Sequence, residues 1–173
     1  MCKAQVPVIG FAAYSGTGKT TLLTQLIPQL KQQGLRVGLI KHSHHRFDID
    51  HPGKDSFRLR EAGAETVILV SSHRRAIMTE FPHPAEPILD EQLAALNQSR
   101  LDLILVEGFK QSQFPKIELH RPVLNNPLIY PNDPNVIAVA TDAPLTIPGN
   151  LQLLDLNQPI EITRFILNFT HLT

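Results

Sequence analysis

The stretch that decides the fold is "AYSGTGKT", residues 13–20. It directly follows "VPVIGFA" (residues 6–12), an apolar run of strand length, and it precedes apolar residues that recur at helical spacing from Lys19 onward. A strand, a glycine-rich turn, and a Lys-Thr pair that opens a helix form the context that a phosphate-binding loop requires. We therefore expect residues 13–20 to bind a phosphate chain.

The residue types in this stretch suit that chemistry. Gly16 and Gly18 permit backbone turns that aim successive N–H groups inward as an anion nest, and the following helix N-terminus adds partial positive charge. Lys19 is expected to bridge the β- and γ-phosphates, and the Thr20 hydroxyl to ligate Mg²⁺. Ala13 stands where the motif usually has Gly. Its methyl group is harmless unless position 13 needs a positive φ, which the end of a strand usually does not.

The rest of the chain alternates strand-like and helix-like patterns. Further buried strands are expected at residues 35–41, 101–110, 116–120, 136–142 and 151–156. Helices are expected from Lys19 to a cap at Gly34, with a bend at Pro28, and at residues 56–63, 88–99 and 159–169. This order predicts an α/β fold: a P-loop NTPase-like, mainly parallel sheet flanked by helices, in a single nucleotide-binding domain over residues 1–173.

An antiparallel hairpin is expected outside that sheet. Residues 66–72 and 75–80 are strand-like and only His73 and Arg74 separate them, although His-Arg is poor turn chemistry for the tightest hairpins. Arg74 is a candidate contact to a phosphate or a partner, and a plain surface charge is the alternative. The unpaired edge strand at residues 75–80 is a candidate dimer surface.

A second motif ends the strand in "LDLILVEG". Ligands of open α/β sheets sit at the carboxyl ends of the strands, where Glu107 lies. Asp102 begins the same strand about 16 Å away at about 3.3 Å per residue, so the two cannot serve one phosphate. Glu107 is expected to hold the Mg²⁺ hydration shell or orient the attacking water, and Gly108 to leave room for the phosphates. The alternative for Glu107 is a solvated strand end.

Thr141 and Asp142 end another strand, in "VIAVATD". A carboxylate there can accept the N1–H and N2–H of guanine, donors that adenine lacks, which favours GTP. Ordinary turn chemistry before Ala-Pro is an equal alternative for Asp142.

The loop that follows Lys41 is polar and rich in histidine. Asp48 and Asp50 in this loop are candidates to reach Mg²⁺ or its waters, as switch segments do. No helix fixes the spacing of possible metal ligands in this loop, and no cysteine is available there as a ligand. A loop that orders on nucleotide or partner binding is therefore favoured over a dedicated transition-metal site.

Composition excludes several classes of function. With 16 basic and 16 acidic residues the formal net charge is zero, which argues against a nucleic-acid or membrane-surface binder and leaves self-association feasible. The single cysteine, Cys2, excludes an intramolecular disulfide. No apolar run approaches the roughly 18 residues that a membrane-spanning helix needs, so a cytoplasmic location is expected.

Several stretches together resemble the family of molybdopterin-guanine dinucleotide biosynthesis adaptor protein B (MobB). They lie between about residues 8 and 156 and read "FAAYSGTGKTTLL", "GLIKHSHHRFDID", "PGKDSFRLREAGA", "MTE", "LDLILVEGFK" and "VIAVATD". The resemblance implies a homodimer that binds GTP and Mg²⁺, hydrolyses GTP slowly, and assists the guanylyltransferase that joins GMP to molybdopterin. Molybdopterin-carrying proteins are further implied partners.

The resemblance also carries over individual residues. It implies phosphate and Mg²⁺ contacts for Gly16, Thr17, Gly18, Lys19, Thr20, Thr21, Glu107 and Gly108, and Ser15 is a candidate beside them. Asp48, Asp50 and Arg74 match family positions with open roles, and the proline-rich run at residues 121–135 matches no motif.

Two other functions stay open. A small-molecule kinase needs a mobile lid rich in Arg or Lys, whereas "GFKQSQFPK" after the Glu107 strand offers two lysines. A pure interaction module with a vestigial phosphate loop would bind no nucleotide. Hydrolysis is expected to be slow because the loop context shows no catalytic Gln or arginine finger. Thr17 also stands where some dimeric phosphate-loop proteins have an activating Lys.

Overall fold

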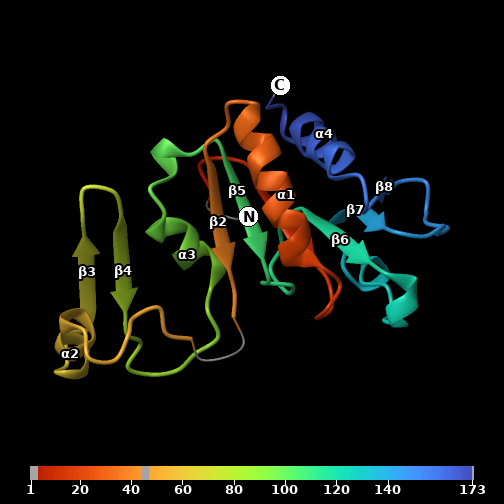
Figure 1. Cartoon of the computed structure of the whole chain (residues 1–173). Coiled ribbons are helices and arrows are strands. Elements are labelled where there is room, and N and C mark those ends of the chain that lie inside the picture. Colours follow the sequence, from red (N-terminus) through yellow and green to blue (C-terminus); the bar gives the residue numbers. More distant parts are fainter. Residues whose placement is uncertain (1–3, 44–46, 173) are drawn as a thin grey trace. The chain divides into compact units, whose positions relative to one another are not determined.

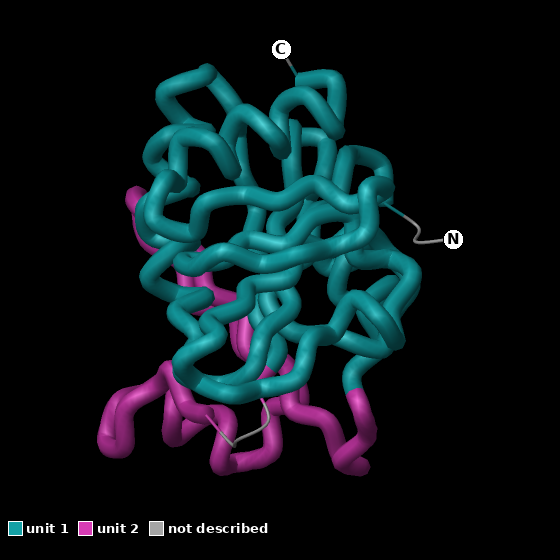
Figure 2. Tube along the Cα trace, turned by 90° about the vertical axis from the view of Figure 1, so that its right-hand side faces the viewer, with its two compact units in different colours: residues 1–42, 87–173 teal, residues 43–86 magenta. Residues whose placement is uncertain are grey.

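The computed structural model describes residues 4–43 and 47–172. The chain forms two compact units (Figure 2): unit 1 comprises residues 1–42 and 87–173, and unit 2 comprises residues 43–86. Each unit is described by itself below. The single domain expected over residues 1–173 stays a prediction.

Unit 1 is built on one parallel sheet (Figure 1). Its six strands, in spatial order, are β2 (Val37–Lys41), β5 (Leu103–Glu107), β1 (Val8–Ala12), β6 (Lys116–His120), β7 (Val136–Thr141) and β8 (Gln152–Asp155). Every neighbouring pair is parallel, so all carboxyl ends meet at one edge. The predicted parallel α/β sheet is confirmed, and β1 delivers the glycine-rich loop at its centre.

Side chains alternate between the two faces of this sheet along each strand, and helices bury both faces. On one face, Ile9 and Phe11 of β1 pack in a core that includes leucines of α1 (Lys19–Gln32) and isoleucines of α4 (Pro159–Thr170). On the other face, Val8 packs with leucines of α3 (Leu89–Ala95). Figure 1 shows α1 and α4 side by side, and Thr163 Oγ1 donates to Gln29 Oε1 between them at 2.8 Å.

The predicted helix from Lys19 and its glycine cap are confirmed. Pro28 lies inside the helix and does not end it. Gly34 has φ +83°, and its N–H donates to the Lys31 carbonyl at 2.9 Å while Leu35 N–H reaches back to the Leu30 carbonyl at 3.3 Å. These are the bonds of a glycine C-cap, as the position of Gly34 predicted.

The proline-rich run at residues 121–135 is anchored to β6. It contains two 3₁₀ turns, η2 (Pro122–Leu124) and η3 (Tyr130–Asn132). The buried Glu118 carboxylate accepts the backbone N–H of Ile129 and of Tyr130, each at 2.8 Å. Burial raises the pKa of Glu118 although these two bonds oppose the change. The run is therefore a fixed connection.

Lys116 provides the other anchor of this run. Its ammonium is almost fully buried, at 1% side-chain exposure, and lies 2.7 Å from the Asp133 carboxylate. It also donates to the Ser112 carbonyl at 2.6 Å. A buried ion pair of this kind fixes the geometry of the segment that it joins.

Unit 2 contains α2 (Asp55–Glu61) and an antiparallel pair, β3 (Thr66–Val70) and β4 (Arg75–Thr79). The predicted hairpin is confirmed, but its connection is longer than His73-Arg74 and runs from Ser71 to Arg74. Ser71 Oγ accepts the N–H of His73 at 3.2 Å and of Arg74 at 3.1 Å. The serine thus supplies the turn chemistry that His-Arg lacks.

Among the described residues, no helix combines the length and apolar character needed to cross a membrane.

Candidate functional site

The loop at residues 13–20 has the backbone that its glycines were predicted to permit. Gly16 and Gly18 have φ of +79° and +103°, in the left-handed region that favours glycine. Gly18 is the N-cap of α1 and provides no side-chain cap, so the first amides of this helix are open to an anion. Ala13 is buried and is absent from the residues with positive φ, so its methyl group is tolerated, as expected.

Lys19 folds back across this loop. Its Nζ donates to the carbonyl oxygens of Ala13 and Tyr14, each at 3.1 Å. Burial lowers the pKa of Lys19, and the nearby ammonium groups of Lys110 and Lys41 lower it further, while Glu107 partly opposes them. An anion bound here would relieve this crowding of positive charge. The hydroxyl-bearing residues Ser15, Thr20 and Thr21 are exposed on the loop and on the first turn of α1.

Glu107 and Lys41 form the neighbouring strand ends. They are register partners on β5 and β2, and Lys41 Nζ lies 3.1 and 3.2 Å from the two carboxylate oxygens of Glu107. Glu107 is only 8% exposed, whereas a solvated strand end would be open to water. Its carboxylate is therefore held at the same edge of the sheet as the loop.

The backbone turns sharply after Glu107. Gly108 has φ +102°, and a Cβ there would lie 2.6 Å from His42 Cβ, so only glycine fits. Phe109 also has a positive φ, +51°, which costs a non-glycine residue of order 1–3 kcal/mol and is typical of functional sites. This bend brings Lys110 Nζ to 5.0 Å from the centre of the Tyr14 ring. A third ammonium thus reaches the loop.

Asp102 lies at the opposite end of β5 and has a different partner. Its two oxygens accept Arg36 Nη2 at 2.7 Å and Nε at 2.9 Å, and Oδ2 also accepts the Arg36 backbone N–H at 2.8 Å. These bonds lower the pKa of Asp102 to about 2. The expectation that Asp102 does not share the site of Glu107 agrees with this geometry.

Arg121 was missed in the sequence reading, which found no motif for residues 121–135. Its Nε donates to the Thr17 carbonyl at 2.9 Å, and its Nη1 donates to the Asp142 carboxylate. The sequence signal that could have identified Arg121 is its position directly after β6, at the sheet edge where the phosphate loop also lies. Asp142 is thereby joined to the loop.

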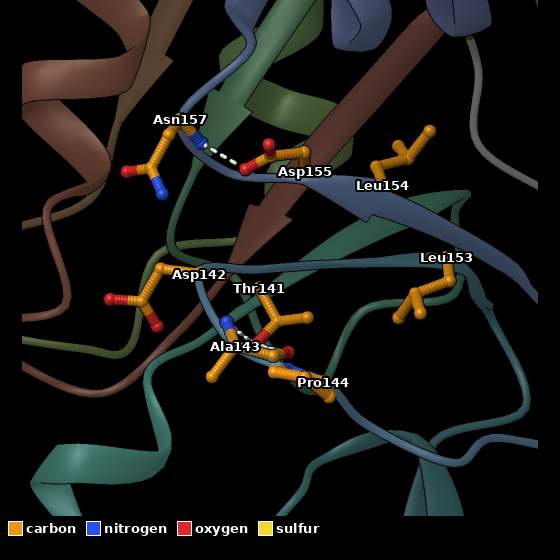
Figure 3. Close-up of a pocket in the computed structure, with 8 residues that line it drawn as sticks. All are labelled: Thr141, Asp142, Ala143, Pro144, Leu153, Leu154, Asp155 and Asn157. Carbon is orange, nitrogen blue, oxygen red and sulfur yellow. Dashed lines mark hydrogen bonds between the residues drawn. The ribbon is translucent and has the colours of Figure 1, made fainter.

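A cavity of about 330 Å³ opens beside Asp142 (Figure 3), where β7 and β8 end. Its lining residues are Thr141, Asp142, Ala143, Pro144, Leu153, Leu154, Asp155 and Asn157. In Figure 3 the side chains of Asp142 and Asn157 extend to one side and those of Leu153 and Leu154 lie on the other. The lining is half polar or charged, from Thr141, Asp142, Asp155 and Asn157, and half apolar.

The remaining candidates belong to unit 2. Asp48 lies 2.7 Å from Arg60 Nη2 and accepts the Asp50 N–H at 3.0 Å, and these bonds lower its pKa, the Asp50 N–H contributing most. Asp50 Oδ1 accepts the Ser56 hydroxyl at 2.9 Å, while its buried Oδ2 has no hydrogen-bond partner within the described chain. Arg74 is exposed at the hairpin turn. Over residues 4–43 and 47–172 there is no group of three or more His, Cys, Asp or Glu suited to a metal ion.

Comparisons with known proteins agree on one family. Residues 8–142 match the family model of molybdopterin guanine dinucleotide synthesis protein B. The molybdopterin-guanine dinucleotide biosynthesis adapter protein of Haemophilus influenzae is 49% identical over 168 residues, with 96% of this chain and 91% of that protein covered. The protein of the same name from Escherichia coli is 47% identical, with 96% and 95% covered.

Solved structures of MobB proteins are similar to this chain in fold. A MobB homologue from Bacillus stearothermophilus superposes with a TM-score of 0.70 at 25% identity, over 96% of this chain and 99% of that one. A second structure, of molybdopterin-guanine biosynthesis protein B, has a TM-score of 0.71 at 24% identity, with 94% and 99% covered, and supports the fold alone.

Proposed function

The chain belongs to the MobB family of molybdopterin guanine dinucleotide synthesis proteins, and from this premise we propose that it is a GTP-binding adaptor. It assists the guanylyltransferase that attaches GMP to molybdopterin. The single observation that carries the nucleotide part is the loop at residues 13–20, with its left-handed glycines, its uncapped helix start and the crowded Lys19 ammonium. That arrangement attracts a polyphosphate.

Mg²⁺ and the phosphates are assigned to the same edge of the sheet. The exposed Thr20 hydroxyl would ligate the ion, and Glu107 would hold its hydration shell or orient the attacking water. The Lys41–Glu107 ion pair keeps that carboxylate in place. Within unit 2, Asp50 has one buried carboxylate oxygen without a hydrogen-bond partner in the described residues, and the Mg²⁺ contacts expected of Asp48 and Asp50 stay predictions. Bound Mg²⁺ would neutralise charge on the phosphates.

Guanine is assigned to the cavity beside Asp142, where β7 and β8 end. Its volume of about 330 Å³ falls within the range of small-molecule pockets. Asp142 lies at its rim, and one carboxylate can accept both N1–H and N2–H of guanine. Adenine presents no such pair of donors, so this carboxylate supports GTP over ATP.

Hydrolysis is proposed to be slow, and GTP binding to be the main property. Thr17 is buried, and its hydroxyl donates to the Tyr14 carbonyl at 3.0 Å, so it offers no charge to the phosphates. Fast GTPases place a water-orienting glutamine and an arginine at the γ-phosphate, whereas here Lys19 and Glu107 are the assigned groups. A cytoplasmic location remains an expectation.

We also propose that the protein is a homodimer formed through the hairpin of unit 2. Ile68 is 58% exposed on β3 and Ile77 is 53% exposed on β4, and the two are register partners. An isolated two-stranded hairpin is marginal in water, and exposed apolar strands usually pair with another surface. A second copy offers a self-complementary surface.

The adaptor role is tested by capturing the purified guanylyltransferase on this protein, with and without GTP, Mg²⁺ and molybdopterin. We expect capture and an increased yield of the guanine dinucleotide product. Lys19→Ala should lose the GTP-dependent part of that increase. Capture that fails in every combination, with no change in product yield, would overturn the adaptor role.

A further inference from the structure

We propose that Arg121 is a positioning residue for the phosphate loop, and that Asp142 raises the affinity for a phosphate chain by holding Arg121 in place. The inference rests on the proposed nucleotide binding and deepens it. One guanidinium, 32% exposed, bridges the two groups: Nε donates to the Thr17 carbonyl at 2.9 Å, and Nη1 donates to the Asp142 carboxylate.

The planar Thr17–Gly18 peptide links the direction of its carbonyl to that of its N–H. No peptide bond in the described chain is cis, so the carbonyl of Thr17 and the N–H of Gly18 point in opposite directions across their shared peptide. When Arg121 holds the carbonyl, the N–H is aimed away from Arg121. A positive charge beside the carbonyl also polarises the peptide, which strengthens the N–H as a donor.

This peptide needs an external restraint. Rotation of the Thr17–Gly18 peptide changes ψ of Thr17 and φ of Gly18, and glycine adopts left-handed and right-handed backbone conformations with similar ease. Gly18 therefore lowers the steric cost of rotating this peptide. The carbonyls of Ala13 and Tyr14 are already held by Lys19 from within the loop. The carbonyl of Thr17 is held by Arg121, which is 104 residues away in the chain.

Asp142 determines where the guanidinium lies. Arg121 follows β6 and Asp142 follows β7, and these parallel strands end in register at His120 and Thr141. The two side chains therefore start from adjacent positions at one edge of the sheet. An Arg–carboxylate contact is charge-assisted and directional, so loss of Asp142 frees a long and partly exposed side chain to leave Thr17.

The test uses inorganic tripolyphosphate with Mg²⁺, a probe that has no base. Titration calorimetry on the full chain should give about fivefold to tenfold weaker binding for Arg121→Ala, the scale of a lost charge-assisted hydrogen bond. Asp142→Ala should weaken binding about threefold or more, although the probe offers it nothing to read. The double variant should bind no more weakly than Arg121→Ala alone, since both changes remove one bridge.

Conservative variants and a matched control complete the design. Asp142→Asn keeps an oxygen for Arg121 and should lose less affinity than Asp142→Ala. Arg121→Lys keeps the charge without the fork, should lose affinity, and replaces Arg121→Ala if that variant does not fold. Arg100→Ala removes an exposed arginine just before the start of β5, at the other end of the sheet, and should bind like wild type. Circular dichroism and the urea midpoint verify the fold of each variant.

The outcomes separate the two proposals. Wild-type protein that binds neither tripolyphosphate nor GTP would overturn the proposed function and this inference with it. Wild-type binding together with an unaffected Asp142→Ala, or a double variant whose losses add, would leave the proposed function standing and overturn the role of Arg121.

Discussion

At the scale of single residues, the phosphate loop was readable from the sequence because its chemistry is local. The glycines, Lys19 and Thr20 lie within a few positions of each other, and their spacing alone requires a strand before them and a helix after them. The contact from Arg121 to Thr17 crosses 104 residues. No local pattern encodes such a contact, so the sequence left Arg121 in an unassigned run.

Asp142 has two proposed roles, recognition of guanine and positioning of Arg121, and experiment can separate them. Asp142→Asn keeps an acceptor for Arg121 but replaces one oxygen with a donor, which cannot pair with the guanine N–H groups. We expect the ratio of GTP to ATP affinity to fall about tenfold, the scale of a lost charge-assisted bond plus an unpaired donor. Competition titrations with the two nucleotides measure this ratio.

Asp155 is the companion for that measurement, because it lines the same cavity and its Oδ1 accepts the Asn157 N–H at 2.8 Å. Asp155→Asn should leave the nucleotide preference near that of wild type. A preference that survives Asp142→Asn and disappears in Asp155→Asn would transfer base recognition to Asp155.

At the scale of elements, strands and helices agreed with the sequence wherever periodicity was strong. Strands β1, β5 and β7 are continuous apolar runs because helices cover both faces of the sheet. The hairpin turn differed from the expected His73-Arg74 connection because Ser71 closes it: its N–H donates to the Arg74 carbonyl at 2.8 Å and its hydroxyl accepts the N–H groups of His73 and Arg74. The proline-rich run could not be placed because its anchors, Glu118 and Lys116, are polar residues buried on a strand.

The Lys116–Asp133 pair yields a prediction on stability. Asp133→Ala should lower the free energy of unfolding by about 3–5 kcal/mol, because it leaves a buried ammonium without its partner. Urea denaturation measures this loss. The double variant Lys116→Met/Asp133→Ala removes the charge as well and should recover much of it. A single variant as stable as wild type would show that the pair does not anchor the run.

The ion pair at the start of β5 yields a prediction on pH. Bonds from Arg36 lower the pKa of Asp102 from 3.8 to about 2 in the folded chain. A carboxyl with a lowered folded pKa stabilises the fold above its unfolded pKa, and that contribution is lost as pH falls through the folded value. Wild type should therefore exceed Asp102→Asn in urea midpoint at pH 5 to 6, and the difference should shrink towards pH 2. A difference that stays constant over this range would contradict the assignment.

At the scale of the whole molecule, the features on which the two proposed roles depend lie in different units. Unit 1 carries the phosphate loop and the cavity beside Asp142, and unit 2 carries an exposed apolar hairpin. The sequence located both features, yet the exposure of Ile68 and Ile77 became apparent only from the hairpin register. A pattern of alternating apolar residues cannot by itself tell a core face from an interface.

The proposed homodimer is tested by sedimentation equilibrium. Wild type should have twice the mass of the 19.3 kDa chain. Ile77→Lys should shift the population towards monomer, because it places an ammonium on the apolar surface of the hairpin. Val123→Lys, at a 78% exposed apolar position in unit 1, should leave the mass unchanged. A monomeric wild type, or a dimer that tolerates Ile77→Lys, would contradict the proposed interface.

The most direct test of the central claim is a calorimetric titration of GTP into wild-type protein and Lys19→Ala in the presence of Mg²⁺. We predict saturable binding to wild type and an affinity reduced about 10–150-fold in Lys19→Ala, or about 1.5–3 kcal/mol, for the loss of a charge-assisted contact. Absence of saturable binding to wild type, or affinities of the two proteins within twofold of each other, would contradict the claim that residues 13–20 hold a nucleotide.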